Sequence, residues 1–381
     1  MNQIRVALLT GNYNHIRDGV SLTLNRWVNF LLQNNAEVLV FGPTITNPPV
    51  AHNGTLISVP SIEMPGRPEY RITMGFPEDA KQKLEDFNPD IVHIATPDLL
   101  GYKGLKWAIE HNIPVVSSFH THFTSYLKYY KLSFIEPIGW KYLKWFYEKC
   151  EQVYVPSKSM IDELESKNID GNFKVWARGV EIENFNPDLR SESWRIEMGF
   201  KKNDIVVTFV SRLVWEKNLQ VYADVLNNLQ KEYSNVKALI VGDGPAMEEL
   251  KEMIPDAAYT GFLKGRKLSI AYASSDIFFF PSESETFGNV TLEAMSSGLP
   301  CVVADAAGSK SLIVDGENGF LAEANDKERF RSQIEKLVLN SDLRNKMGGV
   351  STEKAKGYSW KVINKKLLSY YGEVLQKKIK A

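Results

Sequence analysis

The sequence contains very little cysteine, since Cys150 and Cys301 are the two cysteines among its 381 residues. Two cysteines so far apart cannot make a disulfide framework or a cysteine-rich metal site, and this scarcity favours a reducing, cytoplasmic location. Long apolar runs are also missing, because no segment approaches the ~18 apolar residues of a membrane-spanning helix. The first residues have neither the apolar stretch nor the cleavage site of an export signal. We therefore expect a protein that is not secreted and does not span a bilayer.

An excess of charge of one sign is absent as well. The 45 lysines and arginines nearly balance the 46 aspartates and glutamates, which leaves a formal net charge of −1. Such a balance argues against a nucleic-acid partner that is held by bulk electrostatics. The 44% hydrophobic and 24% charged residues are typical of a chain that folds throughout. A chain of 381 residues is too long for one core, so we expect about two domains.

In the first half, short apolar and β-branched runs alternate with longer stretches of helical spacing, such as residues 21–32 and 99–110. The expected strands are residues 5–10, 37–42, 90–95, 114–120 and 152–156. This alternation of strand and helix predicts a parallel sheet covered by helices on both faces. We expect residues 1–185 to form a Rossmann-like domain.

The same rhythm restarts after residue 186. The expected strands of the second half are residues 205–210, 238–242, 258–261, 277–281 and 301–304. The predicted fold class is therefore α/β, with a second doubly wound, Rossmann-like domain over residues 186–359. The last helical stretch, residues 360–381, is expected to dock back on the first domain. Parallel sheets bind ligands at the carboxyl ends of their strands, so we expect the two domains to face an interdomain cleft.

A pair of glutamates follows the expected strand 277–281. Glu285 and Glu293 lie eight residues apart, on either side of the point where a new helix should begin. The amides of Phe287, Gly288 and Asn289 would lie at the start of that helix, where unpaired N–H groups and the helix dipole attract phosphate. Two glutamates alone would more often be solvated charges. The neighbouring glycine and the strand end favour a ligand site.

Basic side chains follow the first strand of the second half, where Arg212 can form a fork on phosphate oxygens and Lys217 adds a point charge. As isolated residues they would more often be surface charges. The sequence has no Asp-x-Asp pair and no convincing metal-ligand spacing, so we expect no bound metal, with protein cations and a helix dipole offsetting a diphosphate.

Three further positions are candidates at strand ends. Gly242 lies in a tight strand-to-helix turn where backbone can approach a ligand, although simple turn chemistry explains it equally well. Gly19 opens a helix after the first strand, where it could leave space for a sugar or phosphate or merely start the helix. His120 follows an expected first-domain strand and could bind a sugar or acceptor hydroxyl or satisfy a loop backbone.

Taken together, these motifs resemble the retaining glycosyltransferases of family four, which have the GT-B fold, and the resemblance spans nearly the whole chain. It implies donor-sugar contact for Glu285, ribose contact for Glu293, and diphosphate binding by Arg212 and Lys217. Glu285 and Glu293 match the family's paired-glutamate signature. Arg212 and Lys217 match its diphosphate-binding arginine and lysine. Gly19 matches its N-terminal glycine loop, and His120 matches its cleft histidine. It places the base along the backbone near Gly261, Phe262 and Leu263, with phosphates and sugar held at 287–289.

Within the family, residues 99–102, 176–180 and 282–286 are similar to mannosyltransferases and sulfoquinovosyltransferases that build glycolipids. The resemblance implies a GDP- or UDP-sugar as co-substrate, no further cofactor, and transfer of a mannose- or glucose-type hexose to a sugar, glycan or lipid acceptor. It also implies retention, by attack on the face from which the diphosphate leaves rather than through an enzyme nucleophile.

Aromatic residues alternate with lysines in residues 126–131 and 140–149, as in segments that lie at a membrane surface. Trp140, Leu143, Tyr147 and Cys150 also have helical spacing, so the second segment could simply pack on the sheet. Contact with the inner face of the cytoplasmic membrane stays open on this basis.

Two other functions remain as alternatives. A nucleotide-sugar epimerase of the same fold would need similar phosphate contacts, and a two-domain sugar-binding protein would share the two-lobed architecture. A dinucleotide oxidoreductase is less favoured, because no Gly-x-Gly-x-x-Gly follows the first strand.

Overall fold

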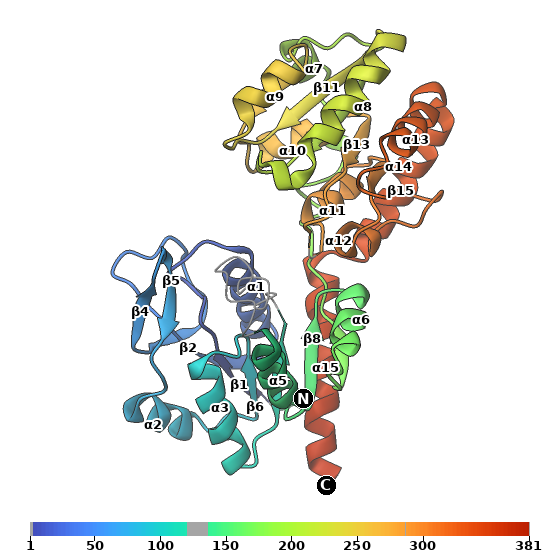
Figure 1. Cartoon of the computed structure of the whole chain (residues 1–381). Helices are drawn as coiled ribbons and strands as arrows, with labels where there is room; N and C mark the ends of the chain where they lie inside the picture. Colours follow the sequence, from blue (N-terminus) through green and yellow to red (C-terminus); the bar gives the residue numbers. More distant parts are fainter. Residues whose placement is uncertain (1–2, 120–135, 286, 381) are drawn as a thin grey trace. The chain divides into compact units, whose positions relative to one another are not determined.

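A computed structural model describes residues 3–119, 136–285 and 287–380. The chain divides into two compact units (Figure 1). The first unit consists of Met1–Trp176 together with Asn364–Ala381, and the second consists of Ala177–Ile363. No helix within the described ranges is long and apolar enough to cross a membrane.

The first unit is built on a parallel sheet with the strand order β3-β2-β1-β6-β7-β8-β9. Its strands are β1 Ile4–Leu9, β2 Ala36–Gly42, β3 Thr55–Ser58, β6 Ile91–Ile94, β7 Val115–Ser118, β8 Gln152–Val155 and β9 Phe173–Val175. Every residue of β6, β7 and β8 is buried, as expected for strands that helices cover on both faces. The helices are α1 Gly19–Gln33, α2 Glu78–Phe87, α3 Leu99–Glu110, α5 Glu136–Tyr147, α6 Lys158–Ser166 and most of α15 Trp360–Lys380.

An antiparallel hairpin stands apart from this sheet and was not expected from the sequence. It pairs β4 Ser61–Met64 with β5 Arg67–Thr73. The hydroxyl of Thr73 donates to the carboxylate of Asp98 at 3.0 Å and accepts the amide of Leu100 at 3.3 Å, so the end of the hairpin is tied to the start of α3.

The long C-terminal helix α15 packs against the strands of the first unit (Figure 1). Tyr371 is fully buried, where its hydroxyl accepts a hydrogen bond from the indole of Trp27 at 3.1 Å and lies 2.6 Å from Nδ1 of His93. The amide of Gln152 donates to Glu373 at 3.0 Å. Aromatic packing and hydrogen bonds thus hold α15 to strands β8 and β6, through contacts that span 221 and 278 residues of sequence.

The second unit repeats the parallel plan with the strand order β12-β11-β10-β13-β14-β15. Its strands are β10 Ile205–Val210, β11 Val236–Val241, β12 Ala258–Gly261, β13 Ile277–Phe280, β14 Cys301–Ala304 and β15 Gly319–Ala322. Its longer helices are α8 Leu219–Glu232, α9 Met247–Met253, α10 Arg266–Ala273, α11 Asn289–Ser296, α13 Lys327–Leu339 and α14 Ser341–Lys356, and its short ones are α7 Glu192–Glu197 and α12 Ala307–Lys310.

The order of the strands explains where a ligand can bind in each unit. In the sheet of the second unit, β10 lies between β11 and β13, so the direction in which successive strands are added reverses beside β10. A reversal of this kind leaves a crevice at the carboxyl ends of the strands. In the second unit this crevice lies among the loops after β10, β11 and β13.

Candidate active site

The loops that follow β10 and β11 pack directly on one another, and glycine permits this. Gly242 has a φ of +144°, and a Cβ there would overlap the carbonyl oxygen of Ser211. A Cβ at Gly244 would overlap the carbonyl of Leu213 in the same way. The amide of Leu213 completes the join by donating to the carbonyl of Asp243 at 2.9 Å. Gly242 is therefore required by the close approach of the two loops, which places it in the wall of the site.

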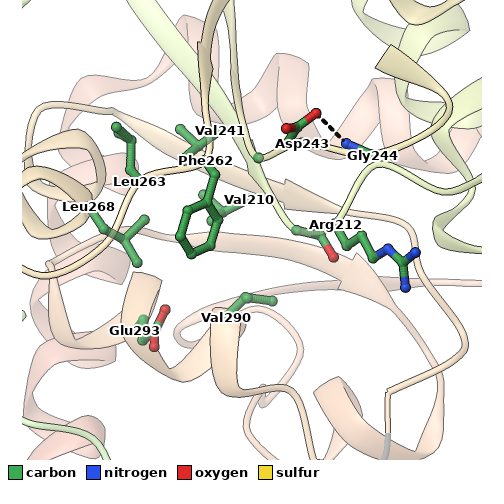
Figure 2. Close-up of a pocket in the computed structure, with 12 residues that line it drawn as sticks. Val210, Arg212, Val241, Asp243, Gly244, Phe262, Leu263, Leu268, Val290 and Glu293 are labelled. Atoms are coloured by element: carbon green, nitrogen blue, oxygen red, sulfur yellow. Dashed lines mark hydrogen bonds between the residues drawn. The ribbon is translucent and has the colours of Figure 1, made fainter. Parts of the chain in front are cut away.

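A pocket of about 540 Å³ opens between these loops and the helices α10 and α11 (Figure 2). Of the residues predicted for the site, it brings together Arg212, Gly242, Leu263 and Glu293. It is also lined by Val210, Ser211, Val241, Asp243, Gly244, Phe262, Leu268 and Val290. Figure 2 shows Phe262, Leu263 and Leu268 grouped together, with Arg212 and Asp243 away from them. The pocket thus has an apolar part and a polar part.

The carboxylate of Glu293 has a fixed position within this pocket. The hydroxyl of Tyr272, on α10, donates to Oε2 of Glu293 at 3.1 Å. Tyr272 is fully buried, and its ring packs near Phe185 and Phe278. Burial raises the pKa of Tyr272 well above its usual value, and the charge of Glu293 adds to this effect, so the phenol stays protonated as a donor. Tyr272 therefore orients a carboxylate that can accept ligand hydroxyls.

A second carboxylate lies beside a lysine at the ends of β10 and β13. The ammonium of Lys217 donates to Oε1 of Glu285 at 2.6 Å and to the hydroxyl of Ser284 at 2.8 Å. The two charged side chains are 13% and 23% exposed, which leaves them accessible to a ligand while partly shielding the pair from water. The side-chain amide of Asn218 donates to the backbone carbonyl of Pro281 at 2.9 Å, which also joins the two loops.

The start of α11 has the geometry that its sequence predicts. Gly288 caps the helix with a φ of +89°, and Asn289 is the first helical residue. Phe287 is 3% exposed and its ring lies 6.0 Å from that of Tyr358, so its side chain belongs to the core. Any ligand contact of Phe287 would therefore come from its backbone. A Cβ at Gly308, in α12, would lie 2.5 Å from the carbonyl oxygen of Glu285, which shows how closely α12 packs on this segment.

Two predicted residues belong to the first unit or fall outside the described ranges. Gly19 is the first residue of α1, is exposed, and has open space where a side chain would begin. The helix start before it is held by Asp18, whose carboxylate accepts the amide of Ser21 at 2.7 Å. His120 lies outside the residues that the structure describes. Among the described residues, no group of three or more histidine, cysteine, aspartate or glutamate side chains is placed to hold a metal ion.

Sequence reasoning missed several residues of this site. Tyr272 lies within a helix of ordinary amphipathic spacing, and its contact with Glu293 spans 21 residues. Leu268 and Val290 line the pocket, although in the sequence they are indistinguishable from core residues, and Phe262 was predicted for its backbone and not for its side chain. The exposure of Phe262, which reaches 73%, is the one sign that it is not a core residue, and sequence alone does not give it.

Comparisons with known proteins agree with this architecture. Residues 17–184 match the family described as Glycosyltransferase Family 4, and residues 190–353 match Glycosyl transferases group 1. The chain is 31% identical over 380 residues to a GDP-mannose-dependent alpha-mannosyltransferase of Corynebacterium glutamicum, which covers 98% of this chain and 89% of that protein. It is 27% identical over 330 residues to an alpha-monoglucosyldiacylglycerol synthase of Streptococcus pneumoniae, covering 84% of this chain and 75% of the relative.

The fold is shared with solved structures at lower sequence identity. A sucrose-phosphate synthase of Thermosynechococcus elongatus superposes with a TM-score of 0.75 at 17% identity, covering 98% of this chain and all of that one. The structural match supports the predicted GT-B fold, and the family and sequence matches support sugar transfer and give no support to the epimerase or sugar-binding alternatives. With family matches in both units and a relative that aligns along almost its whole length, the chain belongs to the family-four, group 1 glycosyltransferases of GT-B fold.

Proposed function

We propose that this glycosyltransferase moves a hexose, with retention at the anomeric carbon, from a nucleoside diphosphate sugar to the headgroup of a membrane lipid. The donor part of the proposal rests on one observation: the pocket of the second unit joins an apolar part to an arginine and an oriented carboxylate. The nucleoside diphosphate part of such a donor carries matching groups in the same order: a base with apolar faces, the ribose diol and a dianionic diphosphate.

The residues divide among the parts of the donor according to their chemistry. Glu293 would accept hydrogen bonds from the ribose hydroxyls, because Tyr272 occupies Oε2 and a carboxylate has further lone pairs to offer. Arg212 and Lys217 would bind the diphosphate together with the first amides of α11, which point out of the helix beside Gly288. Glu285 would accept hydroxyls of the transferred sugar, which is attached directly to the diphosphate.

Retention in this site is best explained without an enzyme nucleophile. The carboxylate of Glu285 already accepts a hydrogen bond from the ammonium of Lys217, and a carboxylate engaged in this way is a poorer nucleophile. We propose that the acceptor oxygen bonds to the anomeric carbon on the face that the diphosphate leaves. The carbon–oxygen bond to the diphosphate breaks, and the acceptor proton passes to an oxygen of the departing phosphate. Positive groups aimed at that phosphate would then contribute most of the rate.

The charge of the departing diphosphate has protein partners available. Arg212 is exposed at the pocket, and Lys217, in the same loop after β10, is partly buried. The N-terminus of α11 adds its helix dipole. We propose that these groups, rather than a metal ion, carry the neutralisation.

The acceptor part of the proposal rests on a surface of the first unit that we call the α3–α5 patch. Its apolar members are Leu99 and Tyr102 of α3, one turn apart, and Ile138 and Trp145 of α5, two turns apart. Leu99, Ile138 and Trp145 are 44%, 66% and 37% exposed. The rings of Tyr102 and Trp145 lie 5.7 Å apart, so the two helices form one surface. The patch includes three exposed lysines: Lys103, Lys106 and Lys141.

Exposed aromatic and aliphatic side chains among lysines suit a surface that meets anionic lipid headgroups. Part of the predicted membrane segment has another role, because Leu143 and Tyr147 are buried and Lys144 donates to the carbonyl of Asn168 at 2.6 Å. Residues 126–131 lie outside the described ranges. The name of the diacylglycerol-glycosylating relative supports a lipid acceptor of this kind.

The experiment that tests the proposal is a donor and acceptor screen with the purified full chain. UDP-glucose, UDP-galactose and GDP-mannose are each offered with vesicles that contain diacylglycerol, and with a water-soluble sugar acceptor as the matched control. We expect one donor to give a glycolipid whose anomeric configuration matches that of the donor. A product of inverted configuration, or transfer to the soluble acceptor alone, would contradict the proposal.

A further inference from the structure

The ion pair of the site is divided between two loops, the one after β10 and the one after β13. Lys217 belongs to the first loop and Glu285 to the second, and their charged atoms lie 2.6 Å apart. A lysine reaches its partner through a flexible four-carbon stem, so the pair by itself does not fix the backbones that carry it. A stiffer contact is needed to hold the two loops at this spacing.

Asn218 provides a contact of this kind, because its side-chain amide donates to the backbone carbonyl of Pro281 at 2.9 Å. The donor directly follows Lys217 in sequence, and the acceptor lies four residues before Glu285. An asparagine side chain is shorter than that of lysine and has fewer rotatable bonds, so its hydrogen bond constrains the backbone more closely. Among the described residues, the other hydrogen bonds between these two loops are those that Lys217 donates to Glu285 and Ser284.

The backbone of Asn218 explains why an asparagine lies at this position. Its φ of +55° and ψ of +41° are left-handed, a conformation that glycine and asparagine adopt most readily. Its N–H donates to the carbonyl of Trp215 at 3.0 Å, which ends the turn that carries Lys217, and its carbonyl accepts the amide of Tyr222 at 3.2 Å at the start of α8. Glycine would allow the same backbone but has no side chain that could reach Pro281. Asparagine meets both requirements.

The spacing of the two loops matters most when the donor is bound, and this step rests on the proposed function. The ammonium of Lys217 has three N–H groups, two of which donate to Glu285 and Ser284. In the proposed complex the third donates to the diphosphate, while Glu285 accepts a hydroxyl of the sugar. We propose that Asn218 is a positioning residue that holds Lys217 and Glu285 at this spacing and does not itself contact the donor.

Two variants separate the hydrogen bond of Asn218 from its backbone conformation. Asn218→Gly keeps the left-handed backbone and removes the amide, whereas Asn218→Asp keeps the size of the side chain but cannot donate as a carboxylate. We expect each to lower turnover at saturating donor by ~10-fold, the effect of one hydrogen bond, with whichever of UDP-glucose, UDP-galactose and GDP-mannose the wild type uses. Wild-type turnover in both variants would overturn the proposal.

Asn227 offers a matched control, because its side-chain amide donates to the carbonyl of Met253 at the same distance of 2.9 Å from within α8. Asn227→Ala should keep wild-type turnover. Hydrogen exchange of residues 282–285 without nucleotide gives a measurement that needs no donor, and we expect it to be faster in Asn218→Gly than in Asn227→Ala. Lost transfer with unchanged exchange in Asn218→Gly would overturn the positioning role and leave the proposed function intact.

A positioning role also requires that Asn218 act through the ion pair. In the Lys217→Ala variant the pair is absent, so adding Asn218→Gly should lower turnover by a further ~3-fold or less. Losses that multiply in full would show that Asn218 acts elsewhere and would overturn the proposal. If Lys217→Ala itself keeps wild-type turnover, the proposed role of Lys217 is wrong, and the positioning role of Asn218 is refuted with it.

Discussion

Lys217 donates a hydrogen bond of 2.6 Å to Glu285 across 68 residues of sequence. The proposed partners of these two groups, a phosphate and a sugar, are joined to each other in the donor. The ion pair therefore places a cation and a carboxylate next to one another, as the donor would need them. It also keeps each charge paired when the site is empty, which lowers the cost of leaving them partly desolvated.

We expect Glu285→Gln to reduce transfer by more than ~100-fold, because an amide is a weaker acceptor of sugar hydroxyls and cannot pair ionically with Lys217. Affinity for the nucleoside diphosphate should stay within ~3-fold of wild type, since the proposed partner is the sugar. Turnover and calorimetry with the nucleotide are the measurements. Glu283→Gln, at an exposed glutamate two residues away, is the control and should keep full activity. Wild-type turnover of the Glu285→Gln variant would show that Glu285 does not bind the transferred sugar.

Removal of either cation should affect the reaction more than the fold. Arg212→Ala and Lys217→Ala are each expected to lower turnover by ~100-fold or more, the loss seen when one preorganised charge-stabilising group is deleted. Lys231→Ala, at an exposed lysine of α8, should change little. We also expect a chelator to leave activity unchanged, and restoration of lost activity by magnesium or manganese would show instead that a metal carries the charge.

The strands show what the sequence predicts well. Continuous apolar runs such as Ile277–Phe280 predict buried strands because both faces are covered, and all of these residues are buried. The hairpin of β4 and β5 was missed because it is largely exposed and contains Pro65, Gly66 and Pro68, which read as loop residues. β9, with three half-buried residues, is too short to give a pattern.

In the site, as in the fold, the features with a local sequence pattern could be predicted and the others could not. Glycine and charge at strand ends predicted Arg212, Gly242 and Glu293, which the structure brings into one pocket, because strand order alone determines which loops meet. The partners of these residues could not be predicted in the same way. The Tyr272 hydroxyl finds Glu293 through the packing of α10 on α11, and no local pattern encodes that contact. The functional roles of all these residues stay predictions until the variants are measured.

Tyr272→Phe tests whether Tyr272 orients Glu293. The ring and its packing remain, and only the hydroxyl that donates at 3.1 Å is lost. We expect affinity for the donor nucleotide to fall by ~10-fold, with turnover at saturating donor less affected. Affinity for the 2′-deoxy nucleotide should fall less, because that ligand has less to gain from an oriented Glu293. Equal losses for the ribose and deoxyribose forms would indicate a general packing defect rather than an orienting role.

The stability of the first unit should depend on pH through His93. Burial lowers the pKa of His93 to about 3, against an ordinary value of 6.5. Between these two values the unfolded chain binds a proton that the folded chain does not, so stability falls as the pH drops below 6.5. From pH 6.5 to 5 we expect this histidine to lower the unfolding free energy by about 2 kcal/mol.

Hydrogen exchange of the amides of Val92 and Ile94, in the buried strand β6, measures this change within the first unit. His93→Asn should abolish most of the slope while lowering stability at every pH, because the contacts of His93 with Tyr371 and Ser118 are lost. An unfolding free energy that is the same at pH 6.5 and pH 5 in the wild type would contradict the neutral, buried state of His93.

The last prediction concerns the α3–α5 patch. We expect the full chain to float with liposomes that contain anionic lipid and to float less with neutral ones, because Lys103, Lys106 and Lys141 add electrostatic attraction to the burial of Trp145 and Ile138. Attraction is worth about 1 kcal/mol for each basic residue near the surface, so exchanging the three lysines for glutamate should weaken binding by more than ~100-fold. Three other lysines of the first unit, Lys81, Lys83 and Lys158, lie on α2 and α6 and provide a control of equal charge change. If both triple variants lose flotation equally, net charge rather than the patch drives binding. If the wild type does not float at all, the lipid acceptor is excluded as a membrane-bound substrate, whereas the family assignment stands on the sequence matches and the fold.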